Sequence, residues 1–175
     1  MKLLEIFKSK NNIQLDKKTL IILRWIAIVG QLITINVVYF IFKFNFPYFY
    51  CFLIIFFGIL SNLYLQFKEK KKLLSNFNST LYLTYDLMQL AALVFFTGGI
   101  TNPFVILLVI PAVVSSAFLS LQSTISLSFI TVISLLTLTV YNYPLPSSGV
   151  LHLHVPKYYL FGIPTAITIG LIFLS

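Results

Sequence analysis

The sequence has few charged residues and a single cysteine. Only 9% of its 175 residues are Asp, Glu, Lys or Arg, whereas a soluble domain usually carries about a quarter. The lone Cys51 cannot form an internal disulfide, and its position in an apolar run is typical of a buried small side chain. With four acidic residues and two histidines, there is little material for a metal centre or an acid–base pair. These shortages argue against a soluble enzyme.

The sequence is rich in long hydrophobic runs. Hydrophobic residues make up 59% of it, and the mean hydropathy is +0.97. Apolar runs of about 18 residues or more follow one another with short polar breaks, and about 20 residues cross roughly 30 Å of hydrocarbon. The sequence therefore predicts an all-α integral membrane protein with six transmembrane helices. The expected spans are approximately 19–42, 47–66, 79–97, 103–121, 124–143 and 158–175.

The distribution of basic residues predicts how the chain is oriented. Nine of the twelve Lys and Arg residues lie in the tail 1–18 or in the segment 68–72, at positions 2, 8, 10, 17, 18, 68, 70, 71 and 72. By the positive-inside rule both segments face the cytoplasm, which places the N-terminus there. The same rule accounts for the net charge of +8. We therefore expect the partner of this chain to be the lipid bilayer and not a nucleic acid.

The final expected span reaches Ser175 without a basic anchor. Because six spans return the chain to the cytoplasm, we expect a cytoplasmic region to follow in the parent protein. The alternative is a small protein that ends at the membrane face.

The segment 98–104, GGITNPF, predicts a tight turn between the third and fourth spans. Gly98 and Gly99 allow the left-handed conformation that ends a helix, and Asn102 followed by Pro103 is typical of a helix start. Such a start leaves unpaired backbone N–H groups that could bind a carbonyl oxygen beside the Phe104 ring. A simple structural turn explains the same pattern.

GGITNPF also resembles the GGxxNPF heptapeptide of the RegB/PrrB-type redox-responsive sensor histidine kinases. Leu23-Arg24-Trp25 and Tyr85-Asp86-Leu87 are similar to that family's segments as well, and the resemblance covers most of residues 19–175. It implies a membrane input domain in the bacterial inner membrane that senses redox state by binding a quinone, either ubiquinone or menaquinone. The residues that it assigns to the quinone are Gly98, Gly99, Asn102, Pro103 and Phe104.

The resemblance also implies partners outside this chain. Histidine kinases generally act as homodimers and pass their signal to a cognate response regulator. The phosphoacceptor and ATP-binding regions are not in these 175 residues, so the chain alone is not expected to be an enzyme and ATP belongs to the kinase portion. The family's redox-active cysteine also belongs to that portion, so Cys51 does not inherit its role.

Asp86 is the only acidic residue inside an expected span, and ionisable groups within a membrane are suspected of function. Arg24 and Asn62 lie at a similar depth, in the inner leaflet. Tyr82 and Gln89 share the helix face of Asp86 at i−4 and i+3. We therefore predict a buried polar cluster of these five residues, acting either as a signalling switch or as attachment between helices. Arg24 alone could also extend to the headgroups.

Two other functions fit the composition less well. A small transporter or channel-like protein would need a polar pathway, for which Gln31, Asn36, Asp86 and the Ser/Thr-rich fifth span are the only material. A membrane enzyme would need a nucleophile–base set or a metal constellation. His152 and His154 are only two ligands, so we interpret them as an exposed loop pair and predict no metal site.

Overall fold

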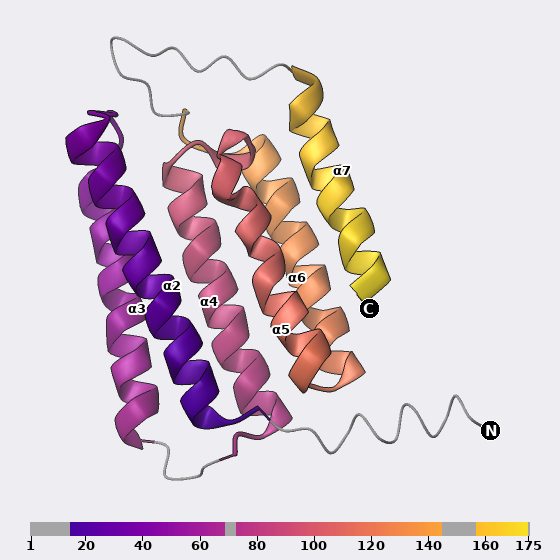
Figure 1. Cartoon of the computed structure of the whole chain (residues 1–175). Coiled ribbons are helices and arrows are strands. Elements are labelled where there is room, and N and C mark those ends of the chain that lie inside the picture. The colour runs from indigo at the N-terminus through magenta and orange to yellow at the C-terminus, as the bar shows by residue number, and fades with distance from the viewer. Residues whose placement is uncertain (1–14, 69–72, 145–156, 175) are drawn as a thin grey trace.

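The computed structural model describes residues 15–68, 73–144 and 157–174, and this part of the chain is helical. Its elements in order are α2 (Lys17–Asn36), the π-helical η1 (Val37–Ile41), α3 (Tyr48–Lys68), α4 (Asn76–Phe96), the 3₁₀ turns η2 (Gly99–Thr101) and η3 (Pro103–Val109), α5 (Ile110–Phe118), α6 (Leu121–Val140) and α7 (Lys157–Leu174) (Figure 1). The described spans are thus helices, as apolar runs of this length predict.

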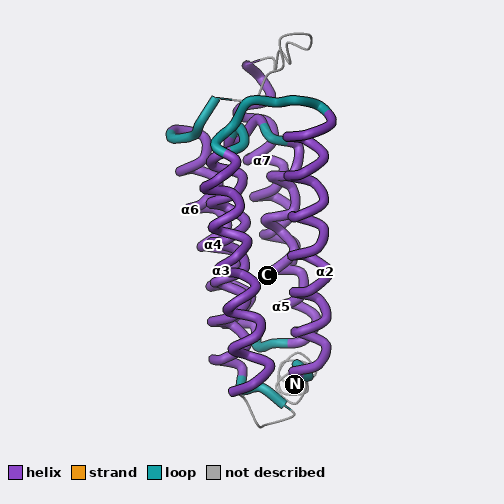
Figure 2. The backbone as a smooth tube through the Cα atoms, turned by 90° about the vertical axis from the view of Figure 1, so that its left-hand side faces the viewer, coloured by secondary structure: helices purple, strands orange, loops and turns teal. Residues whose placement is uncertain are grey.

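The helices lie side by side along one common direction, with α4 in the middle (Figure 1). On one side of α4 lie α2 and α3, and on the other lie α5, α6 and α7; α4 itself packs against α3, α5 and α6. Turned by 90°, the bundle shows α3, α4 and α6 on one side and α2 on the other (Figure 2). The central position of α4 puts it in contact with both halves of the molecule.

Serine caps set where two of the helices begin. Ser75 accepts a hydrogen bond from the Asn78 N–H at 3.2 Å, and Ser120 accepts one from the Ser123 N–H at 3.4 Å, which is the geometry of an N-cap. The break expected at residues 122–123, between the spans 103–121 and 124–143, is wrong, because the Ser120 cap starts α6 at Leu121.

Among the described residues, four helices are long and apolar enough to cross a membrane: Lys17–Ile41, Tyr48–Phe67, Asn76–Phe96 and Leu121–Val140. Two further apolar stretches, Pro103–Phe118 and Phe161–Ile172, are shorter. The chain is accordingly a multi-pass helical membrane protein. Six spans and a cytoplasmic N-terminus stay predictions.

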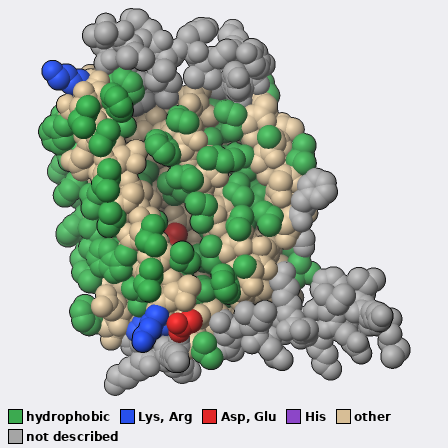
Figure 3. Space-filling view, in the orientation of Figure 1, with side chains coloured by type: hydrophobic (Ala, Val, Ile, Leu, Met, Phe, Trp, Pro, Cys, Tyr) green, Lys and Arg blue, Asp and Glu red, His purple; other side chains and the backbone are tan. Residues whose placement is uncertain are grey.

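The outer surface of the bundle is apolar along its length. Hydrophobic side chains cover the face in Figure 3, and Lys and Arg appear only toward its two ends. Phe57 on α3 and Phe129 on α6 are among the exposed aromatic residues, at 57% and 65% exposure. Such a surface is expected in contact with lipid and would be a liability in water.

Candidate functional site

Both glycines of the 98–104 turn adopt the left-handed conformation. Their φ angles are 117° at Gly98 and 56° at Gly99, and both residues are buried. A Cβ atom on Gly99 would overlap the Asn142 side chain and lie 2.8 Å from the Leu138 carbonyl oxygen. Glycine at position 99 therefore lets the turn lie directly against the C-terminal end of α6.

The side chain of Asn102 is fully engaged within the turn itself. Its Oδ1 accepts from the Phe104 N–H at 2.8 Å, and its Nδ2 donates to the carbonyl oxygen and the hydroxyl of Thr97, at 3.0 and 2.6 Å. The Val105 N–H donates to the Asn102 carbonyl at 3.0 Å. The expectation of unpaired N–H groups at this helix start was wrong, because Asn102 caps them and the chain continues as a 3₁₀ helix.

Pro103 and Phe104 lie on the outside of the turn. Both are exposed, and 43% of Phe104 is accessible. The turn thus presents one aromatic face outward while its polar groups bond to each other.

An open hollow of about 390 Å³ lies at the same end of the bundle. Its described lining is Phe95 of α4 together with residues 140–144, which end α6 and follow it. The Tyr143 N–H donates to the Phe95 carbonyl oxygen at 3.0 Å and holds this segment against α4. Neither Asn102 nor Phe104 lines the hollow.

Aromatic rings extend from this hollow toward α3. Phe96 lies 5.4 Å from Tyr143 and also 5.4 Å from Tyr50, with which it is nearly parallel at 8°. Phe95 makes edge contacts with both Phe96 and Tyr143, at 5.2 and 5.9 Å. Rings from α3, α4 and the segment after α6 are thereby joined beside the hollow.

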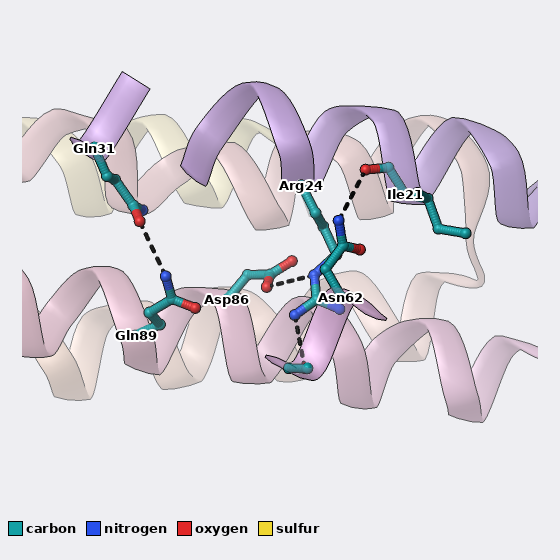
Figure 4. A network of polar contacts seen from close by, with 7 residues as sticks. Ile21, Arg24, Gln31, Asn62, Asp86 and Gln89 are labelled. Carbon is teal, nitrogen blue, oxygen red and sulfur yellow. Dashed lines mark hydrogen bonds and ion pairs between the residues drawn. The ribbon is translucent and has the colours of Figure 1, made fainter. Parts of the chain in front are cut away.

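The predicted intramembrane cluster has Arg24 at its centre. Arg24 Nε donates to Asp86 Oδ1 at 2.8 Å, and Arg24 Nη2 donates to the Ser61 hydroxyl at 2.9 Å (Figure 4). Only 3% of the Arg24 side chain is exposed, so it does not extend to the headgroups. One cation thus joins α2, α3 and α4.

The other predicted members of the cluster take two different positions. Asn62 is fully buried and its Nδ2 donates to the Ile21 carbonyl at 3.3 Å, while the guanidinium of Arg24 lies 5.5 Å from the Tyr82 ring centre. Gln89 does not join them; it donates to Gln31 at 3.0 Å and forms a second connection between α4 and α2 (Figure 4).

Sequence reasoning missed several residues at both places. Ser61 and Tyr85 also contact Arg24, with the Tyr85 ring centre 5.6 Å away, and Gly58 makes room for Gln89 on α3. Asn142 and Tyr143 of the hollow were likewise not singled out. A serine, a glycine or a tyrosine in an apolar helix carries no periodic signal that identifies its neighbour.

Three polar residues considered for a transport pathway, Gln31, Asn36 and Asp86, are each paired with a neighbouring helix. Gln31 and Asp86 pair with α4 and α2 as described, and Asn36 accepts from the Tyr48 hydroxyl of α3 at 3.1 Å. Their pairing favours helix attachment over a pathway.

No metal cluster of three or more candidate ligands occurs among residues 15–68, 73–144 and 157–174. His152 and His154 lie outside the described residues, as do positions 2, 8, 10 and 70–72 of the basic segments.

The fold is thus a helical membrane domain with two distinct sites. One is the buried Arg24–Asp86 ion pair between apolar helices, and the other is the capped turn with the aromatic hollow at one end of the bundle. The chain is 37% identical over 160 residues to the sensor histidine kinase RegB of Cereibacter sphaeroides, which covers 90% of this chain and 34% of that protein. The resemblance found in the sequence is thus confirmed: the chain is similar to a RegB-type sensor kinase over 90% of its length, and it spans about a third of that relative's length. No protein-family model and no solved structure matches it significantly.

Proposed function

We propose that the chain is the input domain of a sensor histidine kinase in the bacterial inner membrane, and that it responds to redox state by binding a quinone. The N-terminus lies in the cytoplasm, so the 98–104 turn and the hollow lie at the periplasmic end. The observation that carries the proposal is the direct contact between this turn, at Gly99, and the wall of the aromatic hollow, at Asn142. The heptapeptide 98–104 is therefore in contact with the hollow that we propose to bind the quinone ring.

The hollow suits a quinone headgroup better than the turn does. The N–H groups of Phe104 and Val105 are already bonded within the turn, so they offer little to a quinone carbonyl. Phe95, Tyr141 and Tyr143 line the hollow, and they supply aromatic rings and two hydroxyls that can donate to a carbonyl oxygen. A volume of about 390 Å³ is at the lower end of the range of ligand pockets, about 300 to 1,000 Å³.

The turn residues then act mainly by shaping the site. Gly98 and Gly99 let the turn approach α6, Asn102 fixes its backbone and Pro103 starts η3. Phe104 faces outward, where the isoprenoid tail or the edge of the ring can lie against it. In this arrangement the five residues position the hollow while Phe95 and Tyr143 contact the ring.

Signalling requires that oxidised and reduced quinone bind one conformation with different affinities, because equal affinities shift no equilibrium. The helix that can carry such a difference inward is α4. It holds Phe95 at the hollow and Asp86 nine residues earlier, about 14 Å along the axis. The kinase activity, the use of ATP, the homodimer and the response regulator belong to this proposal for the parent protein.

The test is quinone binding to the 175-residue chain in lipid nanodiscs, measured by calorimetry with a short-chain quinone. We expect saturable binding that Tyr143→Ala weakens about tenfold, equivalent to about 1.4 kcal/mol. Phe129→Ala removes an exposed ring from the lipid-facing side of α6 and is the matched control, expected to leave binding unchanged.

Two results would contradict this arrangement. If Phe104→Ala lost binding while Tyr143→Ala bound as the wild type does, the quinone ring would lie on the outer face of the turn and not in the hollow. An absence of saturable binding in the wild-type chain would refute quinone sensing by this domain.

A further inference from the structure

Two polar atoms of the Arg24 cluster are buried and make no hydrogen bond: Nη1 of Arg24 and Oδ1 of Asn62. The residues themselves are 3% and 0% exposed. Leaving a buried polar group without a partner costs about 1 to 3 kcal/mol, and more for a charged group. The Nε and Nη2 atoms of Arg24 are bonded, so Nη1 is the guanidinium nitrogen that still needs a partner.

The two atoms belong to the same corner of the α2–α3 contact. Asn62 bonds to Ile21, which lies three residues, or one helical turn, before Arg24 on α2. Ser61, the neighbour of Asn62 in the sequence, bonds to Arg24 itself. Figure 4 shows the Asn62 side chain beside the Arg24 guanidinium.

The orientation of the Asn62 amide follows from its bond to Ile21. A carbonyl oxygen only accepts, so the atom that faces Ile21 has to be Nδ2, and the remaining amide atom is the acceptor Oδ1. Arg24 has only donors, and its Nε and Nη2 are already directed to Asp86 and Ser61. The corner thus offers one spare donor and one spare acceptor.

We infer that a buried water molecule binds at this corner, accepting from Arg24 Nη1 and donating to Asn62 Oδ1. Water is the smallest group that supplies both functions at once, and internal waters typically satisfy buried polar groups of this kind. The Arg24–Asp86 ion pair is then a hydrated assembly, in which three nitrogens of the guanidinium connect to α4, to Ser61 and, through water, to Asn62. This site is separate from the proposed quinone site, because Asp86, to which Arg24 bonds, lies nine residues before Phe95 on α4, about 14 Å along the axis.

The sequence offers a selective probe, because Arg24 is its only arginine. The experiment is solid-state NMR of the full chain in lipid bilayers, with ¹⁵N-labelled arginine and magnetisation transferred from water protons. We expect early water transfer to the Arg24 Nη1 signal in the wild-type protein. Transfer no faster than that to the buried Arg24 backbone amide would overturn the inference without any variant.

Asn62→Leu tests the second partner, since leucine has a similar volume but no acceptor. In bilayers where the variant remains helical and thermally stable, the Nη1 water signal should lose most of its intensity. Ser115→Ala removes a buried hydroxyl between α5 and α6 and should leave the signal unchanged. A full water signal in Asn62→Leu would exclude Asn62 as a partner and overturn the bridging site.

Discussion

The two halves of the bundle use different polar contacts to hold apolar helices together. Between α2, α3 and α4, a few charged or amide groups bond across helices, as in Arg24–Asp86 and Gln31–Gln89. Between α5 and α6 the polar groups are hydroxyls, and most bond to their own helix; Thr131, for example, donates to the Leu127 carbonyl at 2.9 Å.

This difference determines what a lost side chain leaves behind. In the first half, removing one partner strands another buried group, and a stranded charge is costly. In the second half, removing a hydroxyl removes only its own bond to a backbone carbonyl, and that carbonyl keeps its hydrogen bond within the helix. The Ser115–Thr124 contact at 3.1 Å is one of the few hydroxyl contacts there that cross between helices. The α2–α4 half is therefore expected to be far more sensitive to single polar substitutions.

Asp86→Ala should have the largest effect. It leaves Arg24 as an uncompensated charge in the apolar interior, at a cost of about 3 to 5 kcal/mol. Equilibrium unfolding in mixed micelles measures it. Arg24→Leu combined with Asp86→Ala should recover much of the loss; a double variant as unstable as the sum of its singles would show that the pair is not coupled.

Gly99→Ala should have the next largest effect. The left-handed backbone costs a residue with a Cβ about 1 to 3 kcal/mol, and this Cβ also meets Asn142 and Leu138. Gly30→Ala is the matched control, because nothing lies within 4 Å of its added Cβ in the middle of α2, so alanine should stabilise by up to about 1 kcal/mol. Equal thermal midpoints for both variants would contradict the close approach of turn and α6.

Gly58→Ala should have a moderate effect through Gln89. The added Cβ would lie 2.5 Å from the Gln89 amide, which must move and give up its bond to Gln31. Interhelical hydrogen bonds in membranes contribute about 0.6 kcal/mol on average, so a loss of roughly that size is expected in the same unfolding assay. In a Gln89→Ala background the Gly58→Ala change should cost nothing further; an undiminished cost would show that the clash lies elsewhere.

Thr131→Val should have the smallest effect. The hydroxyl bonds mainly within α6, with a weaker contact of 3.4 Å to the Leu108 carbonyl of η3. Valine keeps the shape, so unfolding should change by no more than about 0.5 kcal/mol. A loss as large as that of Asp86→Ala would remove the contrast between the two halves.

The sequence predicted the helical membrane fold, because it follows from hydrophobic length, and it predicted that Arg24 and Asp86 lie together. Arg24 and Asp86 were expected to meet since each was a costly charge at a similar depth. On α3, the contact of Gly58 with Gln89 and the bond of Ser61 to Arg24 were not predictable. The rotation of α3 about its axis decides whether these two residues face inward.

The hollow could not be predicted for a different reason. It joins Phe95 to residues 140–144, which are distant in sequence, and it depends on the Tyr143 bond to the Phe95 carbonyl. The pairing of the N–H groups in the 98–104 turn was also hidden, because it depends on which way the Asn102 amide turns. Neither the backbone bond from Tyr143 to Phe95 nor the orientation of the Asn102 amide leaves a pattern in residue types.

The measurement that tests the central proposal most directly is photolabelling of the 175-residue chain in bilayers with an azidoquinone, followed by mapping of the labelled residues. The account predicts labelling at Phe95 and within residues 140–144, suppressed by excess unlabelled quinone. Competable labelling confined to Pro103 and Phe104, or labelling spread along the lipid-facing surface that excess quinone does not suppress, would contradict a quinone site in the hollow.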